Sequence, residues 1–444
     1  MTTLLERGIP LGTPILRARS PLQEPLWDVD DGHLITFAPT GAGKGVSCLM
    51  PALLCWDGPA IVIDPKGENF QVTAARRRAF GHRVALLDPF GVIGSSKTDR
   101  LNPLDLIGED SPFAADDAAV IAKLCTQGQY FRGDPFWDER AETLITGLVL
   151  YAKLLAKPPR RNLAEVRHAI EASTHDQHDI VTTMRKADNP EMQVAANILG
   201  ISGEMRVRTS IIATASSHMS FLRSGPVQNS TQNSSIDLED VRLGNKLTIY
   251  LVLPPDKLLS HGKLLRLWLG TLMTVMARRR HRPHRPTLLL IDEAAQLGPM
   301  DELRSAITLM RGYGVKCWSF WQDLSQIQTV YPRDWQSLIN NCAVQQYFGV
   351  SSPQAAHQIE TYLGSKMPRP LIQLKPHEAL LIRRGHSAQI VRRPNYLHDP
   401  AYRDLFQPNP FHAASAISGI DLEEEIPVPR TAPNVIGFPQ RGER

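Results

Sequence analysis

Long apolar segments are missing from this sequence of 444 residues. No run approaches the roughly 20 apolar residues that a transmembrane helix requires. The chain from Met1 also lacks the basic start and apolar stretch of a signal peptide. We therefore expect a cytoplasmic chain with no integral membrane span.

Cysteine is scarce, and its pattern argues against a metal-binding cluster. The five cysteines show no metal-ligand spacing, are odd in number and lie in or beside apolar runs. Free cysteine in such surroundings usually acts as a small buried hydrophobic residue. This pattern favours a reducing compartment.

Net charge is also low, at a formal +4, so global basicity does not indicate a nucleic-acid partner. Two local basic runs remain, at residues 76–78 and 278–285. Such clusters attract phosphate backbones or anionic lipid heads. Both runs lie at predicted helix ends, where cations are favoured in any case. We interpret them as solvated helix ends.

Two stretches of the chain alternate short apolar strands with helical segments. These stretches, residues 33–107 and 236–398, predict an α/β fold with a mostly parallel sheet. Residues 1–32 contain several prolines and predict an extended amino-terminal segment. Residues 399–444 read as a Pro-rich carboxy-terminal tail.

The stretch between the two alternating regions has a different character. Strand patterns vanish over residues 108–235, and several amphipathic segments follow one another. Residues 225–235, rich in Ser, Asn and Gln, predict a closing polar loop. We expect an all-helical domain inserted into the sheet domain.

A glycine-rich stretch from Ala38 to Gly45 stands between a predicted strand and a predicted helix, the context of a phosphate-binding loop. Its backbone N–H groups would converge on an anion at the positive end of the helix. Ala38 stands where the first glycine usually is. Gly45 replaces the Ser or Thr whose hydroxyl normally contacts Mg²⁺. The residues expected to contact nucleotide are Thr40, Gly41, Ala42, Gly43, Lys44, Gly45 and Val46.

A second acidic motif follows the apolar strand of residues 288–291. Asp292 stands at the strand end, where it can hold Mg²⁺, and Glu293 can orient and deprotonate a water. Alone, the pair would be two solvated acids. Together with the phosphate loop it predicts a nucleotide site.

Other candidate residues follow neighbouring predicted elements. Gln322 ends the next strand and can sense a terminal phosphate, or be a surface residue. Arg311 ends the intervening helix, either as a dipole-stabilising cation or as an arginine finger in a neighbouring subunit's site. Asp64 and Lys66 follow the strand of residues 60–63, where ligands bind in open α/β sheets, so this loop either lies near the nucleotide or is structural.

With these residues assembled, the chain resembles the TraG/TraD coupling-protein family of type IV secretion and conjugation systems. These are hexameric ATPases related to RecA-like and FtsK/HerA motors. That family often has a glycine after the loop lysine, and it places an all-helical domain where this chain has its insertion. The matching stretches are residues 38–45, 64–68, 86–90, 102–104, 134–137, 291–294 and 321–326.

The resemblance implies that the α/β fold is of the RecA-like P-loop NTPase type. It also implies ATP and Mg²⁺ as cofactors, with Lys44 on the phosphates and Asp292 on the metal. It implies Glu293 for water activation, Gln322 as sensor and Arg311 as a finger acting in trans within a homohexamer. The implied partners are single-stranded DNA with its relaxase and the components of a type IV secretion channel. Many family members begin with transmembrane helices, whereas this sequence has no apolar run of that length. We therefore expect a soluble form, in the cytoplasm or peripheral at the inner face of the bacterial inner membrane.

Three functions from different classes fit these expectations. The leading one is an ATP-hydrolysing pump that moves relaxase-bound single-stranded DNA into the channel. The second is a receptor that hands secreted effector proteins to the channel through the helical domain. The third is a nucleotide-gated scaffold with little turnover, which the missing hydroxyl at Gly45 favours.

Overall fold

The computed structural model describes residues 8–15, 24–95, 97–126, 135–200, 205–364 and 367–411. Asp134 of one family stretch, residues 1–7 and 16–23 of the predicted amino-terminal segment and the predicted tail beyond residue 411 lie outside these residues. Among the described residues, no helix combines the length and apolarity that crossing a bilayer would take.

A mixed sheet of eleven strands runs through the described part of the chain, in the order β2-β1-β11-β10-β9-β3-β8-β7-β4-β6-β5. The strands from β9 to β5 are parallel, whereas β10, β11, β1 and β2 pair antiparallel. The bounds are β1 (Ile9–Pro14), β2 (Leu26–Asp28), β3 (His33–Phe37), β4 (Ala60–Ile63), β5 (Arg83–Leu87), β6 (Leu247–Leu251), β7 (Thr287–Ile291), β8 (Val315–Trp321), β9 (Cys342–Phe348), β10 (Glu378–Arg383) and β11 (Gln389–Arg392). The predicted α/β fold with a mostly parallel sheet is confirmed.

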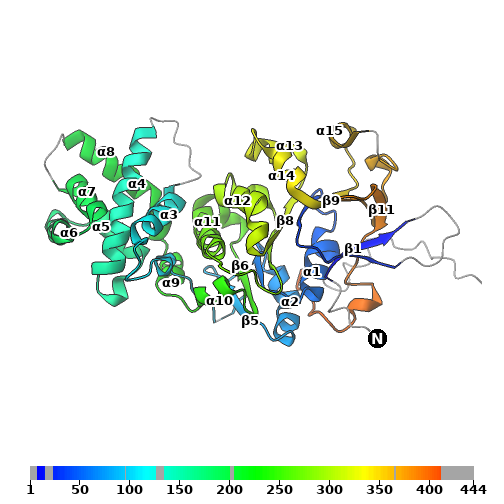
Figure 1. Cartoon of the computed structure of the whole chain (residues 1–444), viewed down its shortest axis with the longest axis horizontal. Helices are drawn as coiled ribbons and strands as arrows, with labels where there is room; N and C mark the ends of the chain where they lie inside the picture. The colour runs from blue at the N-terminus through cyan, green and yellow to red at the C-terminus, as the bar shows by residue number, and fades with distance from the viewer. Residues whose placement is uncertain are drawn as a thin grey trace, which may run out of the picture.

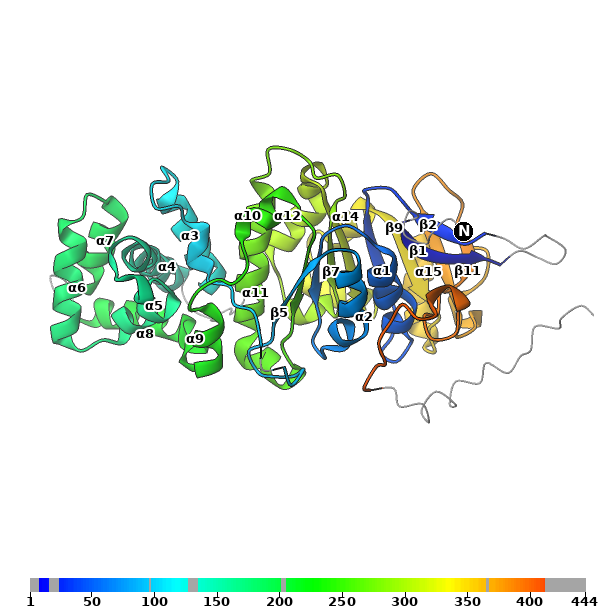
Figure 2. The same cartoon turned by 90° about the horizontal axis from the view of Figure 1, so that it is seen from below.

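Helices cover both faces of this sheet and form a separate group at one end of the molecule (Figures 1 and 2). Those associated with the sheet are α1 (Met50–Cys55), α2 (Glu68–Ala79), α10 (Leu238–Leu243), α11 (Pro255–Ala277), α12 (Asp301–Leu309), α13 (Leu324–Val330), α14 (Trp335–Asn341) and α15 (Pro353–Leu363). The separate group is α3 (Ala114–Thr126), α4 (Pro135–Leu150), α5 (Leu163–Glu171), α6 (Thr174–Lys186), α7 (Pro190–Leu199), α8 (Met205–His218) and α9 (Gly225–Thr231).

Alternate strand residues face opposite sides of the sheet, as the two-residue period of a strand requires. Leu289 and Ile291 belong to a core shared with α11 and α12, whereas Leu288 and Leu290 belong to a core shared with α1. Because both faces are covered, β7 is apolar from Leu288 to Ile291, which is typical of a parallel strand in an α/β fold.

The core on the α11 side continues into the separate helical group. Ile121 of α3 and Leu144 of α4 are fully buried and belong to the same apolar cluster as Leu289. The indole of Trp268 in α11 donates to the carbonyl of Leu101 at 3.1 Å. The described part of residues 108–235 therefore contains helices and no strand, as predicted, and packs on the sheet through α11. The division of the chain into domains stays a prediction.

The predicted polar loop at residues 225–235 is wrong for its first part, which forms α9. Pro226 stands at the helix start, where it is favoured. Val227 and Thr231, one turn apart, are both buried, so packing overrides the weak helix propensity of Ser and Asn. The hydroxyls of Ser234 and Ser235, just after α9, accept hydrogen bonds from the backbone of residues 100–102.

The basic runs are only in part the solvated helix ends that the sequence suggested, because most of their residues are exposed but one arginine in each run is buried. Arg77 is fully buried in α2 and donates to the carbonyls of Trp56 and Gly58. Arg279 is buried and donates to the carbonyls of Tyr313 and Gly314, and Arg278 pairs with Asp117. Much of the positive charge in both runs therefore holds loops and strands together.

Candidate functional site

The parallel strands bring the predicted site residues to one edge of the sheet. Phe37 pairs with Trp321, Ser319 with Ile291, and Ile291 with Ile63. The loops after β3, β8, β7 and β4 therefore leave side by side. This carboxyl edge is where open α/β sheets bind ligands. It carries the phosphate loop, Gln322, the Asp292–Glu293 pair and Asp64.

The loop after β3 has a backbone that glycine makes possible. Gly41 and Gly43 adopt φ values of 78° and 85°, which side chains rarely tolerate. The N–H of Ala42 donates to the carbonyl of Pro39 at 3.1 Å, closing the turn. Lys44 then begins a π-helical turn, Gly45–Leu49, that continues into α1. Such turns occur frequently at functional sites.

The other expected loop residues differ in exposure. Thr40 and Gly41 are exposed at the tip, whereas the side chain of Val46 packs in a cluster with Tyr396. The carbonyl of Val46 accepts from the N–H of Tyr396 at 3.4 Å. The side chain of Val46 is therefore structural, and any contact it makes with an anion would come from its backbone.

Lys44 lies between the two acidic residues that follow β7. Its Nζ forms an ion pair with Glu293 Oε1 and lies 3.9 Å from Asp292 Oδ1. Glu293 Oε2 accepts from Gln322 Nε2 at 3.2 Å. The structure therefore joins Lys44, Glu293 and Gln322, three residues from three different loops, in one contact chain.

Glu293 has an unusual backbone conformation. Its φ and ψ are 54° and 55°, the left-handed region, and with Asp404 it is one of two non-glycine residues with positive φ among the described residues. This region costs a residue with a Cβ roughly 1–2 kcal/mol. Such strain persists only where the surroundings impose it, and it clusters at functional sites.

The side chain of Asp292 is only partly exposed, at 23%, and one of its carboxylate oxygens lacks a hydrogen-bond partner. Burial raises its pKa to about 6, although the neighbouring Lys44 ammonium opposes the shift. Oδ1 is buried and accepts no hydrogen bond. An orphaned carboxylate oxygen beside a phosphate loop fits Mg²⁺, which prefers oxygen ligands and takes one or two carboxylates together with phosphates and water.

Asp64 and Lys66 behave differently from each other. Asp64 is buried, and this burial raises its pKa to about 7 despite a hydrogen bond of 2.8 Å from the N–H of Phe70. Its side chain therefore caps the turn into α2. The side chain of Lys66 is 65% exposed and lies 3.9 Å from Glu68. The contact between Lys66 and nucleotide stays a prediction.

Arg311 lies far from these residues in its own chain. It precedes β8, whereas Gln322 follows it, so the two are separated by the length of the strand, about 20 Å. Arg311 Nη2 contacts Asp31 at 2.6 Å, and its side chain is 51% exposed. Arg311 is therefore not part of the site of its own chain.

Arg393, which sequence reasoning missed, stabilises the phosphate loop through a hydrogen bond to its backbone. Its Nη1 donates to the carbonyl of Ala42 at 2.7 Å, and its guanidinium stacks 3.9 Å from the centre of the Phe348 ring. The guanidinium also donates to the carbonyl of Pro376. The only sequence signal was a basic pair after β11, and nothing in the sequence connects that pair to a loop 351 residues earlier.

A comparison with protein families identifies the group to which these features belong. The family described as "Type IV secretory system Conjugative DNA transfer" matches residues 14–369, well over half of the chain. The chain belongs to this family.

Relatives and solved structures agree with the assignment. A conjugal transfer protein TraG of Escherichia coli is 24% identical over 75% of this chain and 55% of its own length. A VirD4 protein of Rhizobium radiobacter is 25% identical over 77% of this chain and 50% of its own. The chain thus spans about half the length of the curated relatives it matches.

The fold resembles that of the plasmid coupling protein TrwB, solved in complex with a non-hydrolysable ATP analogue. That likeness has a TM-score of 0.65 at 17% identity, and it covers 89% of this chain and 98% of the other. VirB4 of Thermoanaerobacter pseudethanolicus is more distant, with a TM-score of 0.53 at 14% identity over 87% of this chain and 96% of the other. The fold is therefore that of a RecA-like P-loop NTPase.

Proposed function

We propose that this chain is an ATP-hydrolysing coupling protein that recruits relaxase-bound single-stranded DNA and pumps it into a type IV secretion or conjugation channel. The observation that carries the proposal is the contact chain of Lys44, Glu293 and Gln322 at the carboxyl edge of the sheet. Membership of the conjugative DNA transfer family supports the proposed cargo and channel.

The site residues divide the work between them. The N–H groups of Gly41, Ala42 and Gly43 hold the phosphates of ATP. Lys44 breaks its ion pair with Glu293 and neutralises the outer phosphates. Glu293, freed from Lys44, orients a water and takes its proton. Asp292 would hold Mg²⁺, which supplies charge neutralisation on the phosphates when bound. The related TrwB has been solved with ADP and Mg²⁺.

Gln322 connects the site to the next helix. Its side chain contacts Glu293, and its N–H donates to Gln326 Oε1 of α13 at 2.9 Å. A change at Glu293 would therefore reach α13 through one residue. Loss of the terminal phosphate would thus be relayed to α13.

The active form would be a homohexamer in which Arg311 enters the site of the next subunit. Arg311 is exposed, as a finger acting in trans must be, and it would first have to leave Asp31. Mixing Arg311→Ala and Lys44→Ala subunits tests this arrangement, because each variant keeps what the other lacks. The mixture should recover part of the hydrolysis that neither variant shows alone. No recovery would remove Arg311 from the trans site.

Steady-state ATP hydrolysis with and without single-stranded DNA tests the proposed function. We expect Mg²⁺-dependent hydrolysis that DNA stimulates at low salt, and no hydrolysis by Lys44→Ala. Hydrolysis without any DNA binding or stimulation would contradict the pump.

The same assay separates a second candidate, a nucleotide-gated scaffold. Gly45 favours it, because no hydroxyl stands directly after Lys44 to contact the metal. The scaffold predicts tight ATP binding with almost no hydrolysis, with or without DNA.

A third candidate, a receptor for secreted effector proteins, rests on exposed apolar side chains in the helical group and directly before its first helix. Phe113 and Val194 are 63% and 40% exposed. In this case secreted proteins would copurify with the wild-type chain and with Lys44→Ala. They would not copurify with the double variant Phe113→Ser, Val194→Ser.

A further inference from the structure

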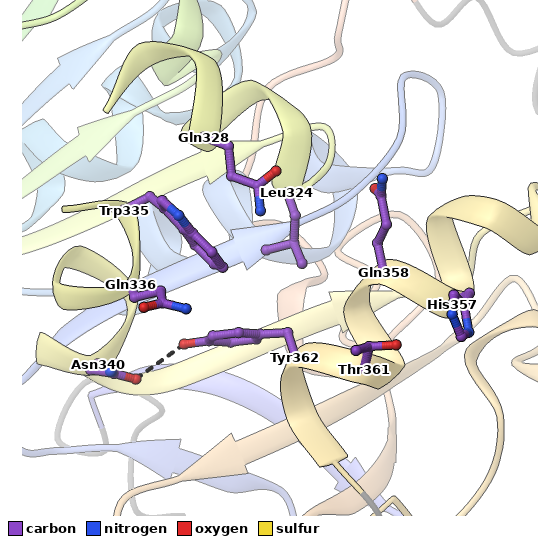
Figure 3. Close-up of a pocket in the computed structure, with 9 residues that line it drawn as sticks. All are labelled: Leu324, Gln328, Trp335, Gln336, Asn340, His357, Gln358, Thr361 and Tyr362. Carbon is purple, nitrogen blue, oxygen red and sulfur yellow. Dashed lines mark hydrogen bonds between the residues drawn. The ribbon is translucent and has the colours of Figure 1, made fainter. Parts of the chain in front are cut away.

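A cavity of about 780 Å³ opens between α13, α14 and α15, outside the nucleotide site (Figure 3). Its size is in the range of ligand pockets in proteins. Leu324 of α13, Trp335 of α14 and Tyr362 of α15 point toward its centre. The cavity therefore has an apolar surface contributed by three separate helices.

The aromatic part of this surface is held in place. The rings of Trp335 and Tyr362 lie 5.3 Å apart at 49°. The hydroxyl of Tyr362 donates to Asn340 Oδ1 at 3.1 Å. Both side chains are partly exposed. Rigid, half-exposed Trp and Tyr side chains are typical of the energetic centres of protein interfaces.

Three glutamines surround the aromatic pair. Gln328, Gln336 and Gln358 each come from a different helix and line the cavity. Within the described residues, none of their side-chain amides has a hydrogen-bond partner. Each amide offers two donors and one acceptor, so it can pair with a main-chain amide, which has one of each.

The three helices are almost free of charge. Glu360 is the one Asp, Glu, Lys or Arg in α13, α14 and α15, and its Oε1 accepts from the N–H of Leu371 at 2.9 Å. Binding of single-stranded nucleic acid combines aromatic side chains with a positively charged groove. A lining of amides and aromatics, with His357 as its single titratable side chain besides Tyr362, favours an uncharged polypeptide.

We propose that this cavity binds an extended, uncharged segment of a partner protein. An aromatic or aliphatic side chain of the segment lies against Trp335 and Tyr362, and its main-chain amides pair with the glutamines. Leu324 lines the cavity, begins α13 and stands two residues after Gln322. A bound segment therefore contacts the start of α13 beside the nucleotide site. Binding itself goes beyond the proposed function, and only its effect on ATP hydrolysis rests on it.

An array of capped nonapeptides without Asp, Glu, Lys or Arg, varied at one central position, tests the proposal on the full chain. We expect binding by peptides with a central Trp, Phe or Leu. A labelled copy of the best peptide then gives the affinity by fluorescence anisotropy. The double variant Gln336→Ala, Gln358→Ala should weaken binding about tenfold or more, since each lost amide pair to a main chain is worth about 1 kcal/mol.

The matched control is Gln354→Ala, an exposed position of α15 outside the cavity, which should bind like the wild type. Lys44→Ala should also bind the peptide, so loss of the nucleotide function would leave this test intact. Absence of peptide binding would overturn the proposal. So would equal binding by the double variant, or binding of an oligothymidylate that the double variant loses.

Discussion

The two edges of the parallel sheet have opposite effects on the pKa of an aspartate. At the carboxyl edge, Asp292 has an orphaned oxygen and burial raises its pKa to about 6. At the amino edge, burial opposes ionisation of Asp31, but hydrogen bonds from Arg311 and Arg282 lower its pKa to about 2. Asp292 therefore has a carboxylate oxygen without a hydrogen-bond partner, whereas the carboxylate of Asp31 is paired with two arginines.

The same contrast holds for the two lysines. Lys316, at the start of β8, is fully buried, and its Nζ lies 2.6 Å from Asp28 Oδ2 in a pair closed to solvent. Lys44, at the other edge, is shared between two acids, one of which has a strained backbone. The charged groups of the amino edge are paired with one another, which stabilises the fold. At the carboxyl edge, the shared lysine and the unpaired carboxylate oxygen of Asp292 fit a ligand.

The largest expected effect is on catalysis at the carboxyl edge. Glu293→Gln removes the proton acceptor, so ATP hydrolysis should fall by roughly 10²–10⁴-fold. The free energy of unfolding should change much less, because glutamine keeps the size of the side chain and can still contact Gln322. Arg282→Ala at the amino edge is the matched control and should keep its hydrolysis. Equal losses of ATP hydrolysis in both variants would contradict the assignment of catalysis to the carboxyl edge alone.

The second effect should be on stability at the amino edge. Lys316→Met leaves Asp28 charged and buried without its partner, which costs about 3–5 kcal/mol of unfolding free energy. Urea denaturation without nucleotide measures this loss. Adding Asp28→Asn to Lys316→Met should recover much of it. A loss below about 1 kcal/mol would mean that the pair is not needed for stability.

Arg393→Ala should affect the affinity for ATP more than the rate of hydrolysis. The guanidinium holds the carbonyl of Ala42 and thus the shape of the phosphate loop, but it touches neither Lys44 nor Glu293. The KM for ATP should rise about tenfold, close to the value of one charge-assisted hydrogen bond, with kcat within about twofold. Arg393→Lys should fall between wild type and Arg393→Ala. A fall in kcat with unchanged KM would contradict this role.

The smallest effect concerns the strained backbone of Glu293. Glu293→Gly and Glu293→Ala lose the same carboxylate, but only glycine accepts a φ of 54° without strain. The glycine variant should therefore be more stable than the alanine variant by about 1 kcal/mol. Chemical denaturation of the two variants measures the difference. An alanine variant as stable as the glycine variant would show that the strain is absent.

The sequence allowed most of the carboxyl edge to be predicted, for a simple physical reason. Lys44, Asp292, Glu293 and Gln322 each follow an apolar strand, and parallel strands end at the same edge. The order of strands was not needed to expect that these residues meet. Their actual partners, such as the Glu293–Gln322 hydrogen bond, required the structure.

The contacts that were missed join segments far apart in the chain or depend on packing. Arg393 reaches the phosphate loop only because β11 folds back through β10 onto β9. Asp31 receives Arg282 and Arg311 because β3, β7 and β8 begin at the same edge. α14 was not expected at all, since its short Asn- and Gln-rich sequence has little propensity to form a helix. The burial of Leu338 and Ile339 stabilises it.

ATP binding by Glu293→Gln, measured calorimetrically beside Lys44→Ala, tests the central claim most directly. If the Lys44–Glu293 ion pair occupies the place of the phosphates, removing the acid frees the lysine. Glu293→Gln should then bind ATP at least as tightly as the wild type, and Lys44→Ala should lose binding. Equal loss of ATP affinity in both variants would contradict the account.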